Sequence, residues 1–336
     1  MKLGDLSITY VELMARAAQT AGFDASHVMN QYELPAERWA LPGHRVSIPR
    51  FLRVGHEVIR QGGIADLGLR MGALTSPSVL GLAGWLADSA DNVRGACEAL
   101  VRYELLASFN ARGRSSFIVE AGKGKLCFYS ISPYNAYNRF IVDMVLKGWA
   151  SLLTHISGED LVERVTIEFE APAWQERYGH HFSCPVQFGA EQNAIVLKSG
   201  ALEKLLLHRC ASHHRWLLDM AEAELAKVKR GLSVSEQVAR ALSPMLEGCA
   251  PELAEVSRQF GKAPWTLKRM LAAENTNYQT VLDNTRRDLA IAYVRETDLA
   301  VGEIAYLTGF GSATAFQRAF KRWTGETPRQ LRQSSV

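Results

Sequence analysis

The chain has 336 residues, more than one typical domain, so two domains are expected. Hydrophobic residues make up 47% and charged residues 22%, proportions that are ordinary for a soluble globular protein. The net charge of +3 does not by itself indicate a nucleic-acid partner. From Ala250 onward, however, 12 Lys and Arg face 9 Asp and Glu, so the whole excess lies where phosphate contacts would need it.

The cysteines indicate a reducing compartment. They are odd in number and scattered, without a Cys-x-x-Cys pair: Cys97, Cys127, Cys184, Cys210 and Cys249. The first residues lack the apolar core of a signal peptide, and the uncharged stretch 74–87 is too short to span a bilayer and contains Pro77. A cytoplasmic protein with free thiols is therefore expected, with no membrane partner.

In the first two hundred residues, some segments repeat apolar residues with the spacing of a helix and others alternate them as a strand does. Helical spacing predicts helices over 9–20, from about Ser26 to before Pro35, over 48–62, over 92–108 and over 138–156, with a glycine-broken helix or turn at 66–73. Alternation and flanking glycines predict a β-hairpin from 116–120 and 125–131, and further strands at 165–169, 186–188 and 194–197. A short polar helix or loop is expected at 172–181. This part is therefore predicted to be an α/β (α+β) domain over residues 1–200.

A long helical stretch then follows. It covers 201–229 and ends at Gly231, so residues 201–231 are predicted to be a helical connector. A C-terminal all-α domain is predicted over 232–336, and its first helix is expected at 234–246.

Residues 301–323 have the pattern of a helix-turn-helix. Val301 to Leu307 form a first apolar-faced helix, and Gly309 can adopt the positive φ of the turn. In the next helix Phe316 and Phe320 lie four residues apart, on one buried face. The opposite face is predicted to reach base edges from early in the helix, and it carries Ala313, Thr314, Gln317 and Arg318.

A second such unit covers residues 252–274. Gly261 marks its turn, and Pro264 suits the first position of the next helix because its missing N–H is not needed there. With Leu267 and Leu271 directed inward, the outward residues are Trp265, Thr266, Lys268 and Arg269.

The two units are separated by residues 278–296, which contain no Gly or Pro and read as one helix about 28 Å long. Successive major grooves on one face of DNA lie about 34 Å apart. A rigid spacer of this size is suited to placing two reading helices in neighbouring grooves.

These residues resemble the DNA-binding domain of the AraC/XylS family of bacterial transcription regulators. The matching strings are Thr266-Leu267-x-Arg269, Arg286-Arg287-x-Leu289-Ala290, Ile304-Ala305-x-x-x-Gly309-Phe310, Phe316-x-Arg318-Ala319-Phe320 and Trp323-Thr324-Gly325-x-Thr327-Pro328. The chain departs from the family at Ala263, where a serine N-cap is usual, and at Leu331, where an aromatic residue is usual. Losing such a cap costs about 1 kcal/mol.

The N-terminal part resembles the α/β domain of one branch of that family, called arabinose-binding. The resemblance is carried by the order of its elements and by Gly68-Leu69-Arg70-Met71-Gly72 and Phe169-x-x-Pro172. It implies effector sensing or dimerisation, and the sugar in the label is not taken literally.

The predicted DNA contacts follow from side-chain chemistry. Arg318 and Arg269 can bond guanine as a fork, and Gln317 can pair with adenine. Trp265 can pack on a sugar or a thymine methyl. Lys321 and Arg322 are predicted phosphate partners, and Thr327 begins a short helix whose amides could hold a phosphate.

Other clusters were weighed against ordinary structural roles. Four aromatic residues could line an effector pocket or simply form core: Tyr134, Tyr137, Phe140 and Trp149. The run with His208, Cys210, His213 and His214 lacks the closing pair of a structural zinc site, so no metal is predicted. Neither a catalytic constellation nor a cofactor motif stands out, so an enzyme is not expected.

The family resemblance implies a homodimeric activator that binds promoter DNA, contacts RNA polymerase and responds to a small molecule. The alternative is a ligand-independent dimeric repressor or an architectural DNA-binding protein.

Overall fold

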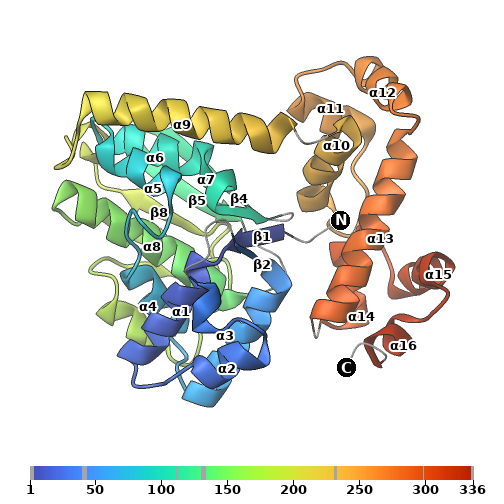
Figure 1. Cartoon of the computed structure of the whole chain (residues 1–336), viewed down its shortest axis with the longest axis horizontal. Coiled ribbons are helices and arrows are strands. Elements are labelled where there is room, and N and C mark those ends of the chain that lie inside the picture. Colours follow the sequence, from blue (N-terminus) through green and yellow to red (C-terminus); the bar gives the residue numbers. More distant parts are fainter. Residues whose placement is uncertain are drawn as a thin grey trace. The chain divides into compact units, whose positions relative to one another are not determined.

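A computed structural model describes residues 4–39, 44–110, 113–129, 134–230, 233–297 and 299–333. The chain divides into two compact units (Figure 1), residues 5–226, here the N-terminal unit, and residues 227–336, here the C-terminal unit, with which residues 1–4 are grouped. Over the described residues, no helix has both the length and the apolar character that a membrane crossing requires.

The N-terminal unit is mixed α/β. Its helices are α1 Thr9–Thr20, α2 Ser26–Gln31, α3 Ile48–Gly62, α4 Leu67–Ala73, α5 Leu82–Ser89, α6 Val93–Arg102, α7 Glu104–Ala107, α8 Arg139–Ser157 and α9 Ala211–Arg230, with short 3-10 turns at Ala36–Arg38, Gln175–His180 and Ala201–Glu203. Its strands are β1 Gly4–Ser7, β2 Arg45–Ser47, β3 Ser108–Asn110, β4 Arg114–Glu120, β5 Lys123–Tyr129, β6 Val162–Thr166, β7 Val186–Gln187 and β8 Ala194–Leu197.

The strands form two sheets. A three-stranded sheet has the order β2-β1-β3, and a five-stranded sheet has the order β4-β5-β8-β6-β7. The predicted hairpin is β4 and β5, which pair antiparallel with Phe117 opposite Leu126. Its predicted last residues, 130–131, lie outside the described residues. Strands β6 and β7 are parallel, whereas β8 is antiparallel to both β5 and β6.

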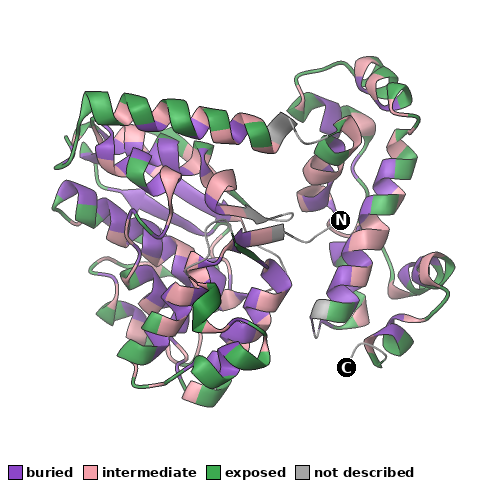
Figure 2. Ribbon diagram, in the orientation of Figure 1, coloured by how far each residue is buried: buried purple, intermediate pink, exposed green. Residues whose placement is uncertain are grey.

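Helix α8 is the centre of the N-terminal core, and Figure 2 shows it buried along most of its length. Helix α4 packs closely against it because two glycines remove the side chains at the contact. A Cβ on Gly68 would lie 2.2 Å from the carbonyl oxygen of Phe140, and one on Gly72 would lie 2.5 Å from Cβ of Lys147. The string Gly68-x-x-x-Gly72 is therefore explained by helix packing.

The predicted helix over 201–229 is wrong in its first part, because α9 begins at Ala211. Residues 204–210 are not helical and include a turn at 207–208, and their amides bond other segments of the N-terminal unit. Leu206 N donates to Asp91 O at 3.1 Å, Leu207 N to Ile156 O at 2.9 Å and Cys210 N to Ser89 O at 3.2 Å. These tertiary bonds replace the bonds to the fourth preceding carbonyl that a helix needs. The predicted end of the stretch, residue 231, lies outside the described residues.

The predicted helix over 92–108 is also divided in the structure. Helix α6 ends at Arg102, the four-residue α7 follows, and the chain is already in β3 at Ser108. Buried Tyr103 lies at the break, and its hydroxyl donates to Glu222 of α9 at 2.6 Å. Packing of Leu217, Ala221 and Leu225 beside Tyr103 attaches α9 to the N-terminal unit.

The described residues from 233 to 333 form helices joined by turns and loops, without a strand. The C-terminal unit contains α10 Val234–Leu242, a 3-10 turn at Ser243–Met245, α11 Leu253–Gln259, α12 Pro264–Ala273, α13 Tyr278–Glu296, α14 Val301–Leu307, α15 Ala313–Thr324 and α16 Pro328–Gln333. Helix α13 contacts α10, α14, α15 and α16, so it is the central element of this unit. The predicted fold class, an α/β domain followed by a helical domain, is confirmed.

Candidate nucleic-acid interface

Helices α11 and α12 form the first helix-turn-helix. The first turn of α11 is closed by Glu255, whose carboxylate accepts the amide of Glu252 at 2.9 Å. Gly261 supplies the turn with φ +58°, and Pro264 occupies the first turn of α12. At the N-cap position Ala263 makes no side-chain bond, as its small side chain predicts. Val256, Leu267 and Leu271 are fully buried, which fixes the outward face of α12.

Glu274 follows the last residue of α12 and binds the start of α10. Its carboxylate accepts the amides of Val234 at 2.6 Å and Ser235 at 2.9 Å. The amide bonds, that of Ser235 foremost, hold the pKa of the Glu274 carboxyl below its usual value. An acid at these amides also complements the positive end of the α10 dipole. The first reading helix and α10 are thereby joined.

Helices α14 and α15 form the second helix-turn-helix. Ser312 caps α15 by accepting the amide of Ala315 at 3.2 Å, and Gly325 ends it with φ +80°. Phe316 and Phe320 are fully buried, so Gln317 and Arg318 must face outward. Phe310 packs edge-on against Phe316, with ring centres 5.7 Å apart.

Arg286 of α13 fastens the turn of this second unit. Its Nε donates to the Thr308 carbonyl oxygen at 3.1 Å, a second nitrogen donates to the Gly309 carbonyl, and the guanidinium lies over the Phe310 ring. Gly309 has φ +73°, and a Cβ there would lie 2.6 Å from the carbonyl oxygen of Cys249. In the sequence Arg286 belongs to a family motif, and nothing in the local pattern indicates this positioning role.

The predicted base-reading residues are accessible. Trp265, Lys268 and Arg269 on α12 are exposed, as are Thr314, Gln317 and Arg318 on α15, whereas Thr266 and Ala313 are half-buried. Helix α12 lies at the N-terminal end of α13, and α15 lies beside its other half (Figure 1). Helices α12 and α15 are therefore offset along α13.

Trp265 is the most solvent-exposed large hydrophobic residue of α12, with 65% of its surface accessible. The guanidinium of Arg269 lies 5.5 Å from the ring centre. This cation–π contact orients both side chains on the outward face of α12. An exposed indole beside a guanidinium offers an apolar and a cationic group to the same neighbour.

The phosphate partners predicted near the end of the second unit differ in availability. Lys321 and Arg322 are exposed in the last turn of α15. Thr327 is half-buried, and its amide and hydroxyl both donate to Oε1 of Gln330, at 2.9 and 2.8 Å. Thr327 Oγ1 in turn accepts the amide of Gln330 at 3.3 Å, so Thr327 is the N-cap of α16, and its own amide already has an acceptor. Exposed Lys262, in the turn before α12, is a further cation beside this helix and is not among the predicted contacts.

A cavity of about 100 Å³, partly open to the surface, lies in the N-terminal unit. Trp149 lines it, whereas the other three predicted pocket residues are not part of its wall. The hydroxyl of Tyr134 donates to Glu168 at 2.6 Å. The ring centres of Tyr137 and His56 lie 4.1 Å apart, and Phe140 is buried against Phe51. The cavity wall is formed by Leu6, Tyr10, Ile48, Leu52, Thr75, Leu80, Ala83, Leu100, Glu104, Ala107, Ser108, Ser115, Phe128, Asn138, Ile141, Met144, Val145, Gly148 and Trp149.

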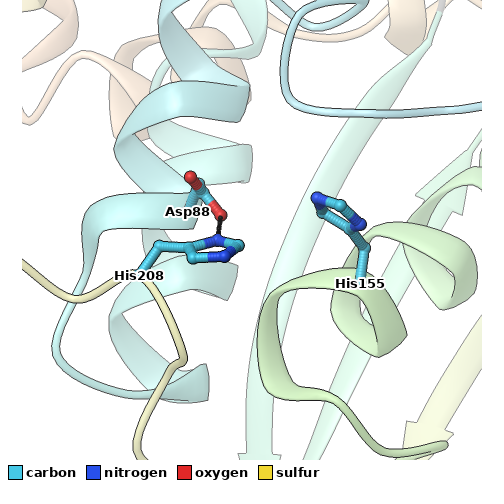
Figure 3. A group of neighbouring side chains, drawn as sticks. All are labelled: Asp88, His155 and His208. Carbon is cyan, nitrogen blue, oxygen red and sulfur yellow. Dashed lines mark hydrogen bonds and ion pairs between the residues drawn. The ribbon is translucent and has the colours of Figure 1, made fainter.

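The four residues of the His/Cys run have separate neighbours. His214 Nδ1 lies 3.1 Å from Ser89 Oγ, the His213 ring lies beside Trp216, and Cys210 Sγ lies 3.5 Å from Ser212 Oγ. His208 instead meets Asp88, Nδ1 to Oδ1 at 2.7 Å, with His155 nearby (Figure 3). Only His208 of the four therefore belongs to a group of metal-ligand type.

Comparison with known proteins agrees with this geometry. Residues 22–206, more than half of the chain, match the family described as the arabinose-binding domain of AraC transcription regulators, N-terminal, and residues 256–334 match a helix-turn-helix domain family. The ornithine utilization regulator of Pseudomonas aeruginosa is 24% identical over 97% of this chain and 96% of its own length. The regulator VirS of Mycobacterium tuberculosis is 23% identical over 96% and 94%.

Among solved structures, the transcriptional regulator CdpR of Pseudomonas aeruginosa is similar over 93% of this chain and 98% of its own, with 23% identity and a TM-score of 0.41. The family matches cover both units, and the family is one of transcription regulators rather than enzymes. The chain belongs to the AraC family and is a DNA-binding transcription regulator of the helix-turn-helix type.

Proposed function

We propose that this regulator activates transcription in response to a small-molecule effector, which it binds in the cavity of the N-terminal unit. It acts as a cytoplasmic homodimer on promoter DNA and contacts RNA polymerase there. The observation that carries the proposal is the cavity itself, because a well-packed core contains few voids larger than a water molecule. A retained space of about 100 Å³ in the sensing half is suited to a ligand.

The cavity wall connects parts of the chain that are distant in sequence. It takes residues from β1, α3, α6, α7, β5 and α8, including Leu52, Leu100 and Trp149. A ligand that contacts all of these elements changes their packing together. This arrangement supports a sensing role, since an effector shifts a conformational equilibrium only by its differential affinity for the two states.

Helix α9 supports dimerisation. Its inner face, with Leu217 and Leu225, is buried in the N-terminal unit. Its outer face carries Trp216 and Met220, which are 57% and 40% exposed and lie one turn apart. An exposed apolar pair of this size on a regulator is the kind of surface that a second copy covers.

Promoter binding would use both helix-turn-helix units. The 19-residue α13 separates α12 from α15, and both present exposed polar and cationic side chains. The base and phosphate contacts are those predicted from the sequence, with Arg318 and Gln317 on bases and with Lys321 and Arg322 on phosphates. The five free cysteines support a reducing cytoplasm.

The test begins with the DNA that the full chain binds, identified by genomic footprinting. Small molecules that the products of the genes beside these sites would use or make are then titrated into the protein by calorimetry. For each one that binds, DNA affinity and transcription in vitro are measured with and without it. The proposal expects one metabolite to bind and to raise transcription. Repression by the bound protein, unchanged by every metabolite, would contradict it and would favour the ligand-independent repressor or architectural protein.

A further inference from the structure

The cavity in the N-terminal unit is apolar apart from a few groups, and one of these is an acid. Glu104 of α7 lines it, together with the polar side chains of Tyr10, Thr75, Ser115 and Asn138. Burial raises the pKa of the Tyr10 phenol, so this group stays neutral at physiological pH. The Glu104 carboxyl is therefore the group that determines the charge of the cavity.

Two donors of β4 hold the Glu104 carboxyl in place. Ser115 N donates to one oxygen at 3.2 Å, and Ser115 Oγ donates to the other at 2.8 Å. Both bonds favour the ionised form, while burial, the larger effect, raises the pKa of Glu104. The fold thus provides hydrogen bonds to this acid without offsetting the whole cost of its burial.

Within the described ranges, no Lys or Arg forms an ion pair with Glu104. Arg45 is close enough to Tyr10 to lower the pKa of its phenol, whereas Glu104 raises it. Arg45 is already paired with Asp5 at 2.5 Å and donates to the Leu106 carbonyl oxygen at 3.1 Å. A buried carboxylate without a cation is costly, and a cationic ligand removes that cost. Glu104 is therefore poised for a positive group that enters the cavity.

Resting on the effector role proposed above, we propose that the cavity binds a compact organic amine, whose ammonium pairs with Glu104 and whose apolar body contacts Leu100, Ile141 and Trp149. The chemical class of the ligand follows from charge. The Glu104 carboxylate would repel an anionic ligand in these apolar surroundings and would attract an ammonium group. The size follows from the volume. A cavity of about 150 Å³ holds a benzene ring, so about 100 Å³ suits a body of about four or five carbons.

The experiment uses three probes with one apolar body: n-butylamine, 1-butanol and pentanoate. Each is titrated calorimetrically, at millimolar concentration, into the full-length protein and two variants. Glu104→Gln keeps the shape and one acceptor for Ser115 but removes the charge. Val145→Phe, from the α8 part of the wall, fills the space instead. Circular dichroism and DNA affinity confirm that each variant folds.

The expected result is that the native protein binds n-butylamine at least tenfold more tightly than 1-butanol and binds pentanoate weakest. Glu104→Gln abolishes the amine preference and leaves 1-butanol binding unchanged, and Val145→Phe weakens both. Equal amine binding by the native protein and Glu104→Gln would overturn the proposal, as would a preference for pentanoate or no amine binding.

The effector role is judged separately. Should 1-butanol or pentanoate bind best, and should Val145→Phe block that binding, the cavity remains a ligand site and only the amine class fails. Should a metabolite found in the calorimetric screen bind equally to the native protein and Val145→Phe, the cavity is not the effector site, and both proposals fail.

Discussion

The guanidinium of Arg286 lies 4.7 Å from the centre of the Phe310 ring, so the central helix α13 is attached to the turn between α14 and α15. The same guanidinium bonds the carbonyl oxygens of Thr308 and Gly309. The orientation of α15 thus depends on one side chain that lies outside the predicted base-reading face.

Replacing Arg286 with Ala is expected to lower the free energy of unfolding by about 2 kcal/mol and to weaken DNA binding, because two carbonyls lose a charged donor. Urea unfolding of the full chain, followed by the circular dichroism of its helices, measures the first effect. Arg287→Ala is the control, since Arg287 pairs with partly exposed Asp288 and should change stability by less than about 0.5 kcal/mol. Equal losses in both variants would remove Arg286 from this role.

Gly309→Ala should destabilise the protein by at least about 2 kcal/mol, since the backbone there has φ +73° and a Cβ would meet the Cys249 carbonyl. Gly302→Ala, in the first turn of α14, meets no atom within 4 Å and should be neutral or stabilising by up to about 1 kcal/mol. Thermal unfolding of the two variants compares them directly. A Gly309→Ala variant as stable as the native chain would show that the turn has another geometry.

Arg318→Ala is expected to weaken binding to the footprinted promoter site by about 1–3 kcal/mol and to relax preference at one base pair. Its side chain is exposed on α15 opposite the buried Phe316 and Phe320. Binding to a library of sites mutated at single positions gives both quantities. If affinity and base preference were both unchanged, Arg318 would not lie on the reading face.

Lys321→Ala should weaken binding to all sequences alike and reduce the slope of log K against log salt by about one, because a phosphate contact carries no sequence information. Measurements at four salt concentrations, on the specific site and on unrelated DNA, determine that slope. A loss limited to the specific site would contradict the phosphate role.

Asp143 should make stability depend on pH. It is 2% exposed on α8, accepts the Tyr178 hydroxyl at 2.7 Å, and burial raises its pKa to about 7 from 3.8. The folded chain therefore holds this proton more tightly than the unfolded chain does, and the stabilisation present below pH 3.8 is lost as the pH rises through 7.

The variant Asp143→Asn keeps an acceptor for Tyr178 but cannot ionise. Its stability relative to the native chain should rise by about 2 kcal/mol between pH 5 and pH 8. Asp219→Asn, on the exposed side of α9, is the control and should show no such rise. Parallel stability curves for the native chain and Asp143→Asn would mean that Asp143 titrates normally.

The secondary structure was most predictable in long segments with one sustained apolar period and at turns that require glycine. Helix α13 contains no Gly or Pro over 19 residues, and Asn277 caps it by accepting the Thr280 amide. Strands β1 and β2 were missed because three or four residues are too few to show alternation. Helix α5 was missed because its sequence, LAGWLADS, begins in an uncharged stretch without a clear polar face.

The ligand cavity was only partly predictable. Clustered aromatic residues signalled an apolar region, but Phe140 fills the place that a side chain at Gly55 would occupy, and Tyr137 lies against His56. Empty space depends on how distant segments pack, which local patterns do not encode. Glu104 could not be predicted as a pocket residue, because a single acid in an apolar segment forms no motif with a recognisable spacing.

The bond between Glu274 and the first amides of α10 has a consequence for how such regulators diversify. Both partners lie within the C-terminal unit, so an exchange of sequence upstream of Ser233 leaves them together. Gene fusion at that point would transfer the C-terminal unit to another protein with α10 still bonded to Glu274. A junction placed after residue 240 would instead separate α10 from its acceptor, and chimaeric regulators joined there should fold less well.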